Sequence, residues 1–71
     1  MVTRGLYEHF KGKLYHVMTV AEHTETGERL VIYRHVLKPG DNIWADDIIW
    51  ARPESMFEEI LENGQPRFKK I

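Results

Sequence analysis

The 71-residue sequence predicts a mainly β fold, a small barrel of about five short antiparallel strands with one short helix over residues 54–62. Two observations predict it. Short runs rich in β-branched and aromatic residues recur along the chain with Gly- or Pro-containing turns between them, and no crossover helix separates them. Only after Pro53 does the apolar spacing change from that of strands to that of a helix. At this length we expect one domain over residues 1–71.

The first two strands are expected on either side of Gly12, over residues 6–10 and 14–21. In the first, alternation puts Leu6 and Phe10 on the core side if these two apolar residues are buried. The opposite, outer side would then carry Tyr7, His9 and Lys11. The run 14–21 is apolar on both faces, which suits a strand that curls around a small core.

The clearest local signal is an antiparallel hairpin formed by Leu14–Ala21 and Arg29–Val36. The polar stretch between them ends near Gly27, which supplies the positive φ that a short hairpin loop usually needs. The second run is rich in Val, Ile and Tyr, which favour a pleated surface.

The segment 38–42 contains Pro39-Gly40 and reads as a turn, and we expect 38–47 to be an ordered loop that tucks in Trp44. A short strand, Ile48–Arg52, follows and is closed by Pro53. An exposed Trp44 would indicate an interface, whereas a buried one would be a structural plug.

The helix over 54–62 is predicted because its apolar residues recur at helical spacing and its glutamates take the other side. Pro53 and Glu54 suit its start, and Gly64 suits its end. Residues 66–71 are expected to return as a last short strand that buries Phe68.

Composition excludes several classes of protein. The chain has no Cys, so a disulfide framework, a Cys-based zinc site and a Cys nucleophile are excluded. No apolar run approaches the roughly 20 residues of a membrane span, and residues 1–10 lack the apolar stretch of a signal peptide. We therefore expect no membrane partner and no cofactor.

Catalytic and metal motifs do not emerge either. The four histidines, separated by 7, 7 and 12 residues, lack the spacing of ligands on one strand or helix face, and we expect them to face solvent on strands and turns. The five glycines are isolated, so the chain has no Gly-rich phosphate loop. Ser55, the only Ser, lacks the flanking glycines of a nucleophile elbow. We therefore expect neither a metal site nor an enzyme. The four histidines are His9, His16, His23 and His35.

A resemblance covers most of the chain, from about Leu6 to Phe68. The segments that carry it are Tyr7-Glu8-His9-Phe10-Lys11-Gly12, Leu14-Tyr15-His16-Val17, His23-Thr24-Glu25-Thr26-Gly27-Glu28, Val31-Ile32-Tyr33-Arg34, Trp50-Ala51-Arg52-Pro53-Glu54-Ser55-Met56-Phe57 and Pro66-Arg67-Phe68. In this order they resemble a family of small bacterial proteins known as domain of unknown function 1653. The resemblance implies an SH3-like barrel and a cytoplasmic origin in a bacterium or phage, and it implies no activity. The stretch 35–48 looks longer than the family's usual connection.

Two aromatic–arginine pairs on neighbouring strands favour a binding function. Tyr33-Arg34 and Trp50-Ala51-Arg52 combine rings with guanidinium groups, which stack on aromatics and recognise carboxylates or phosphates. Our interpretation is a non-enzymatic module that recognises a protein or peptide. Its expected binding residues are Tyr7, His9, Lys11, Tyr33, Arg34, Trp50 and Arg52.

Each of these residues also has a purely structural interpretation. Tyr7 would then pack at the barrel edge, and His9 would bond a nearby backbone group. Trp50 would fill the barrel. The arginines would pair with Glu28, Asp46 or Glu54.

Charge suggests a second hypothesis, because a net charge of −1 conceals segregation along the chain. Residues 1–20 carry +2 and residues 63–71 carry +3, while the middle of the chain is acidic. In an SH3-like barrel the first and last strands commonly lie close together, which would join these ends into one basic patch able to hold nucleic acid. Its residues would be Arg4, Lys11, Lys13, Arg67, Lys69 and Lys70. Mobile, solvated ends would explain the same charges.

Overall fold

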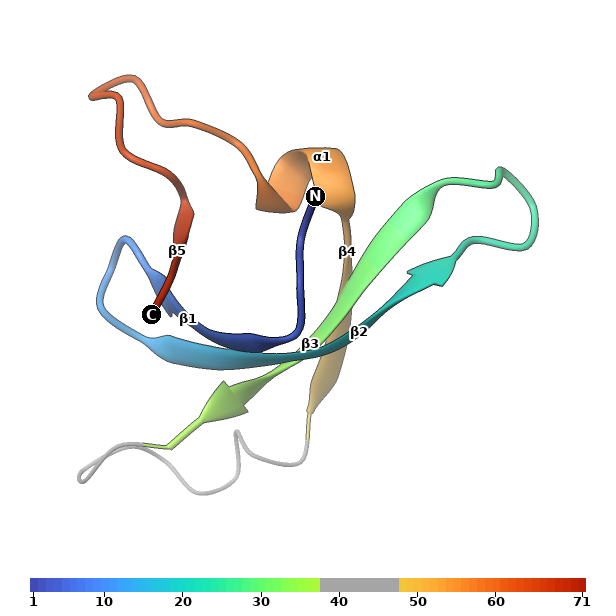
Figure 1. Cartoon of the computed structure of the whole chain (residues 1–71), viewed down its shortest axis with the longest axis horizontal. Helices are drawn as coiled ribbons and strands as arrows, with labels where there is room; N and C mark the ends of the chain where they lie inside the picture. The colour runs from blue at the N-terminus through green and yellow to red at the C-terminus, as the bar shows by residue number, and fades with distance from the viewer. Residues whose placement is uncertain (38–47) are drawn as a thin grey trace.

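A computed structural model describes residues 1–37 and 48–71; the loop expected at 38–47, with Trp44, lies outside the described residues. The described part confirms a mainly β fold in which five strands form one antiparallel sheet of order β4-β3-β2-β1-β5 (Figure 1). The elements are β1 Gly5–His9, β2 Leu14–Glu22, β3 Arg29–Val36, β4 Ile49–Pro53, α1 Glu54–Phe57 and β5 Phe68–Lys70.

The sheet is strongly bent but not closed, so it resembles the expected barrel only in its curvature. Its two edge strands are β4 and β5, which do not pair with each other. Helix α1 lies over the bent sheet, between β4 and β5 (Figure 1). We call the face turned toward α1 the inner face, and the opposite face the outer face.

The predicted hairpin is confirmed as β2 and β3, which pair from Leu14↔Val36 to Glu22↔Arg29. Gly27 in its loop has φ 75°, a conformation that L side chains rarely adopt. The register shifts between Val17 and Thr19, which marks a β-bulge. A bulge increases local twist, and this helps β2 to follow the bend of the sheet.

The core lies on the inner face and is mostly aromatic. Phe57 of α1 stacks on Phe68 of β5, with ring centroids 4.1 Å apart. The Phe57 ring also meets the rings of Tyr7 and Tyr33 edge to face, with centroids 5.3 and 5.5 Å away. One turn of helix therefore ties three strands together. The buried apolar residues are Val2, Tyr7, Val17, Val31, Tyr33, Phe57 and Phe68.

The expected outer position is wrong for Tyr7 and also for His9, whose ring packs against Phe68 with centroids 4.9 Å apart. Tyr7 is buried on the inner face, where its hydroxyl donates to the Thr3 carbonyl at 2.8 Å, whereas Phe10 is 48% exposed. The expectation assumed that Phe10 continues the alternation of β1. The strand ends at His9, however, and Phe10 belongs to the following turn, so it does not define a strand face.

The helix predicted over 54–62 is also wrong in length, because α1 ends after one turn at Phe57. The next residues form a loop that returns the chain to β5, with an isolated bridge between Ile60 and Pro66 and a bond from the Arg67 N–H to the Glu59 carbonyl at 2.9 Å. Ile60 is 61% exposed, so a longer helix would have had little apolar surface to pack against.

The start of α1 is fastened to the N-terminal segment and to β3 by Glu54. This carboxylate accepts from the Val2 N–H at 3.1 Å and from Arg29 Nε at 2.9 Å. The backbone bond first, and then the bond from Arg29, lower the pKa of Glu54 below its ordinary value of 4.5. Arg29, rather than Arg34 or Arg52, is thus the partner of Glu54.

Candidate binding site

The principal candidate site is a cavity of about 190 Å³ on the inner face, which we call the aromatic pocket. All five strands contribute to its wall, because the register brings one end of each strand to the same region of the bent sheet. Phe68 stands opposite His9 in the β1–β5 pair, and Trp50 stands opposite Tyr33 in the β3–β4 pair. The lining residues are His9, Tyr15, Tyr33, Trp50, Arg52 and Phe68.

Tyr15 of β2 is at the centre of the aromatic wall. Its ring meets Tyr33, Phe68 and Trp50 edge to face, with centroids 5.5, 5.7 and 5.9 Å away. Such contacts fix ring orientation in addition to burying area, so the wall is preformed by the sheet. Because paired strands hold every ring, a ligand that entered the pocket would not have to order a loop first.

The pocket is electropositive. The Arg52 guanidinium lies over the Phe68 ring, 5.5 Å from its centroid, and no described carboxylate forms an ion pair with it. Burial lowers the pKa of His9 below 6.5, and the nearby charges of Arg67, Lys11 and Arg52 lower it further. His9 is therefore neutral at pH 7, and none of the described residues that line the pocket is acidic.

Burial also raises the pKa of Tyr15 above 10, an effect that neighbouring Tyr33 adds to and Arg52 partly opposes. Tyr15 therefore keeps its hydroxyl proton across the physiological range. The wall thus offers uncharged rings, a neutral imidazole and one guanidinium.

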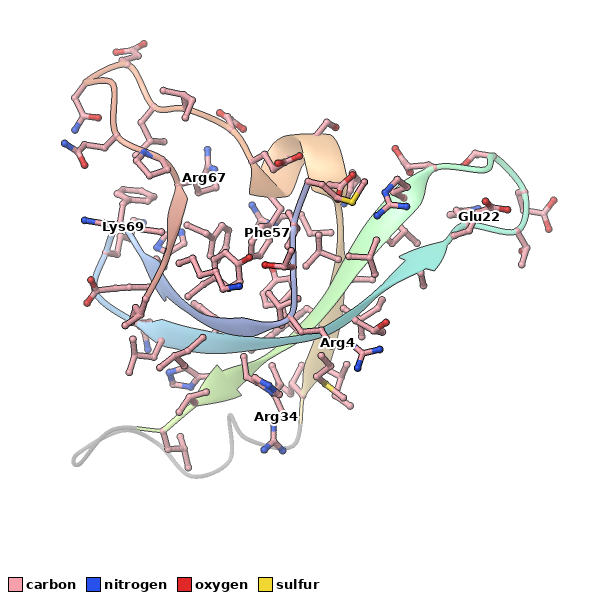
Figure 2. All side chains as sticks on the ribbon, viewed as in Figure 1. Arg4, Glu22, Arg34, Phe57, Arg67 and Lys69 are labelled. Carbon is pink, nitrogen blue, oxygen red and sulfur yellow. The ribbon has the colours of Figure 1, made fainter. Side chains whose placement is uncertain are left out.

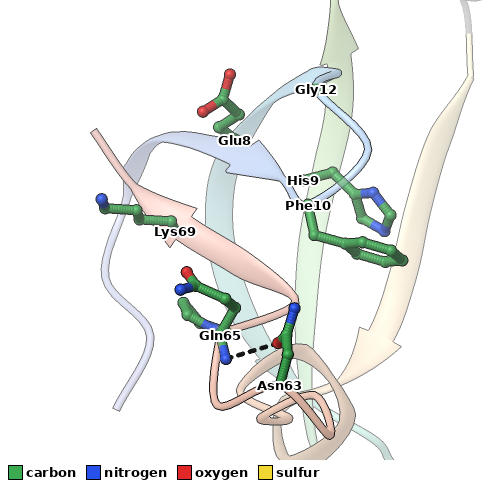
Figure 3. Close-up of a pocket in the computed structure, with 8 residues that line it drawn as sticks. Glu8, His9, Phe10, Gly12, Asn63, Gln65 and Lys69 are labelled. Atoms are coloured by element: carbon green, nitrogen blue, oxygen red, sulfur yellow. Dashed lines mark hydrogen bonds between the residues drawn. The ribbon is translucent and has the colours of Figure 1, made fainter.

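A second, larger groove of about 410 Å³ lies beside the aromatic pocket (Figure 3). It runs between the β1–β2 turn and the loop before β5, where the Asn63 side-chain oxygen accepts from the Gln65 N–H at 2.9 Å. Its lining residues are Glu8, His9, Phe10, Gly12, Asn63, Gln65, Pro66 and Lys69. His9 lines both cavities, so its imidazole forms part of the boundary between them.

The structure brings together four of the predicted binding residues, His9, Tyr33, Trp50 and Arg52, at the aromatic pocket. It separates Arg34, which is exposed on the outer face (Figure 2), from its neighbour Tyr33. The other two predicted binding residues, Lys11 and Tyr7, do not line the pocket.

Sequence reasoning missed the pocket residues Tyr15 and Phe68. Phe68 was expected in the core and, in the nucleic-acid hypothesis, beside the basic patch. Tyr15 could have been found from the hairpin register, which places it opposite His35 and next to the Val17↔Tyr33 pair, so that Tyr15 and Tyr33 share one face of the sheet.

The basic ends of the chain do meet, because β1 pairs with β5. Several of these basic side chains nevertheless face an acidic residue or lie far from the others. Arg67 forms an ion pair with Glu59 at 3.1 Å, and Lys69 stands opposite Glu8. Arg4 lies well away from Lys69 (Figure 2). Lys70 donates to the Thr3 hydroxyl at 2.6 Å, and the charged groups of Lys11 and Arg67 lie 5.7 and 5.8 Å from the centroid of the exposed Phe10 ring.

The histidines differ in their surroundings. His9 and His23 accept the backbone N–H two residues ahead through Nδ1, and His16 is exposed. The expectation that all four face solvent is wrong for His35, which is 3% exposed and packs against Tyr15 at 5.4 Å. Over residues 1–37 and 48–71, no group of three His, Asp or Glu side chains is placed to share a metal ion.

The fold and the pocket define a small, mainly β domain with a preformed aromatic cavity. Residues 5–70 match the family model described as a protein of unknown function, DUF1653, and the chain therefore belongs to this family, as its sequence segments predicted. It is similar to the crystal structure of a DUF1653 protein from Bordetella bronchiseptica. The similarity has a TM-score of 0.74 and 26% identity, and covers 99% of this chain and 87% of that one.

No curated protein matches the chain. In the described parts of the chain, the longest helix is one turn, and none has the length or apolarity needed to cross a membrane.

Proposed function

We propose that this protein is a non-enzymatic binding module that recognises a protein or peptide partner by holding one of its side chains in the aromatic pocket. The observation that carries the proposal is the composition of the pocket wall, in which four aromatic rings, the His9 imidazole and one arginine converge from five paired strands. Aromatic and Arg side chains in partly buried pockets are the groups that dominate binding energy at protein interfaces.

The size of the pocket favours a side chain over a whole cofactor. Small-molecule sites usually enclose roughly 300–1,000 Å³, whereas the aromatic pocket encloses about 190 Å³. One planar or branched side chain fills such a volume. The remainder of a partner would lie on the surrounding surface, of which the larger groove beyond His9 is the nearest part.

The test is selection from a random peptide display library against the immobilised chain, followed by binding of the selected peptides to variants. Trp50→Ala removes one pocket wall and should lower affinity by about tenfold or more, which corresponds to ~1.4 kcal/mol. Because Trp50 also packs on the core, Arg52→Ala serves as a second pocket variant, and Arg34→Ala on the outer face is the matched control. Peptides whose affinity responds equally to all three substitutions would refute the proposal.

A second candidate function, binding of single-stranded nucleic acid, is favoured by one observation. The exposed Phe10 ring has Lys11 and Arg67 close by, an arrangement that suits stacking of a base with cations for the backbone. Lys11→Glu should then weaken binding of a labelled oligonucleotide, and the affinity of the unmodified chain should fall steeply with salt. Binding that does not change with salt, or no binding at low salt, would eliminate this candidate.

A further inference from the structure

We propose that the partner is an acidic peptide segment, in which a carboxylate pairs with Arg52 beside the aromatic pocket while the chain continues past His9 into the larger groove. This inference rests on the proposed function and names the chemistry of the ligand.

The charge of the pocket favours an acidic ligand. Arg52 is fixed over Phe68, and no described acid forms an ion pair with it, so its guanidinium is available for an incoming carboxylate. Guanidinium and carboxylate match geometrically and can form two parallel hydrogen bonds. Lys11 and Arg67 add positive charge on this side of the pocket, because both lie within 6 Å of the Phe10 ring that packs against His9.

The same features disfavour a cationic ligand. Aromatic rings alone could form a cage for a methylated lysine or another ammonium group. Here, however, a guanidinium already lies over one of the rings, and over residues 1–37 and 48–71 no carboxylate lines the pocket to balance a second cation. The pocket therefore selects against positive side chains by like-charge repulsion.

The adjoining groove favours a peptide over a small acid. The two cavities share His9, so a chain anchored in the pocket can extend directly into the larger groove. The groove offers the side-chain amides of Asn63 and Gln65, and amides both donate to and accept from peptide groups. Lys69 adds a cation that stands opposite Glu8.

The experiment is a titration of the ¹⁵N-labelled full chain with three capped peptides that differ only in charge, Gly-Glu-Phe-Glu-Gly, Gly-Gln-Phe-Gln-Gly and Gly-Lys-Phe-Lys-Gly. The indole N–H of Trp50 and the side-chain N–H of Arg52 report on the pocket, and the Lys69 amide reports on the groove. We expect the Glu peptide to shift all three signals and to bind about tenfold more tightly than the Gln peptide. The Lys peptide should bind least, and the Glu-to-Gln ratio should shrink as salt is added.

Two variants make the result specific. Arg52→Gln should remove the advantage of the Glu peptide over the Gln peptide, whereas Arg34→Gln, which removes the same charge from the outer face, should leave it unchanged. Unchanged amide spectra away from the pocket would show that both variants fold. An advantage that persists in Arg52→Gln, or disappears equally in Arg34→Gln, would overturn the inference.

The outcomes separate this inference from the proposed function. If the Gln or Lys peptide binds as tightly as the Glu peptide, the acidic preference is wrong, while recognition through the pocket stands. If none of the three shifts Trp50, the inference is overturned. The library selection then decides the proposed function: neutral or basic peptides that depend on Trp50 would uphold it, and the absence of any Trp50-dependent peptide would remove both.

Discussion

Replacement of Phe57 by Ala should remove most of the stability of the domain. Phe57 is 2% exposed and contacts aromatic rings from β1, β3 and β5. Truncation of a buried Phe to Ala costs about 3–5 kcal/mol, because transfer free energy is lost and a cavity remains. At about 0.05–0.15 kcal/mol per residue, a domain of 71 residues has a total stability of only about 4–11 kcal/mol. This loss is comparable with the whole stability at the lower end of the range, where Phe57→Ala should populate the unfolded state at 25 °C.

The assay is urea denaturation followed by circular dichroism, with Ile60→Ala as the matched control. Ile60 belonged to the apolar side of the helix predicted over 54–62, but it is 61% exposed in the structure, so its truncation should cost less than about 0.5 kcal/mol. If Phe57→Ala unfolds outright, Phe57→Leu keeps the comparison measurable. It loses the aromatic pair energies, at about 0.5–1.5 kcal/mol each, but little volume. Equal costs for truncation of Phe57 and of Ile60 would refute the assignment of α1 as a single turn anchored by one ring.

Three further predictions concern stability. Gly27→Ala should lower the free energy of unfolding by about 1–2 kcal/mol in urea denaturation, because φ 75° is costly for any residue with a Cβ even though open space surrounds the position. Since the folded state lowers the pKa of Glu54, this carboxylate stabilises the fold above pH 4.5, and its contribution is lost as the pH falls through the lowered pKa. In thermal melts, the loss of stability on acidification should therefore be smaller in Glu54→Gln than in the control Glu62→Gln. The lowered pKa of His9 means that the unfolded chain binds its proton more readily, so stability should decline as the pH falls from 6.5, and His9→Gln should reduce that decline where His16→Gln does not.

Local sequence signals identified the hairpin, the strand before Pro53 and the return of Phe68 to the core. These elements follow from short-range rules, since Gly27 fixes a loop and alternation fixes which side chains share a face. The length of α1 could not be obtained in the same way. Its apolar spacing continues to Leu61, but only the tertiary fold shows that no partner surface covers Ile60 and that the chain must turn back to reach β1.

The candidate site was partly predictable for the same reason. Trp50 and Arg52 were identified because an aromatic ring stands close to an arginine in the sequence, and residues two positions apart do lie on one side of a strand. Arg34 was included as the neighbour of Tyr33, although adjacent strand residues point to opposite faces. The inner position of Tyr7 depended on where β1 ends, and the pairing of Glu54 with Arg29 depended on long-range packing that a single sequence does not encode in its spacing.

The short length of β5 has a consequence for how the pocket is maintained. Phe68 forms one pocket wall and belongs to a strand of three residues, paired only with β1. A segment held by so few bonds at the edge of a sheet opens locally more often than the whole domain unfolds. Each such opening dismantles the pocket, so a ligand that requires Phe68 would slow amide hydrogen exchange in β5 in proportion to its occupancy. The exchange rate of the last strand is thus a sensor of binding that needs no label on the ligand.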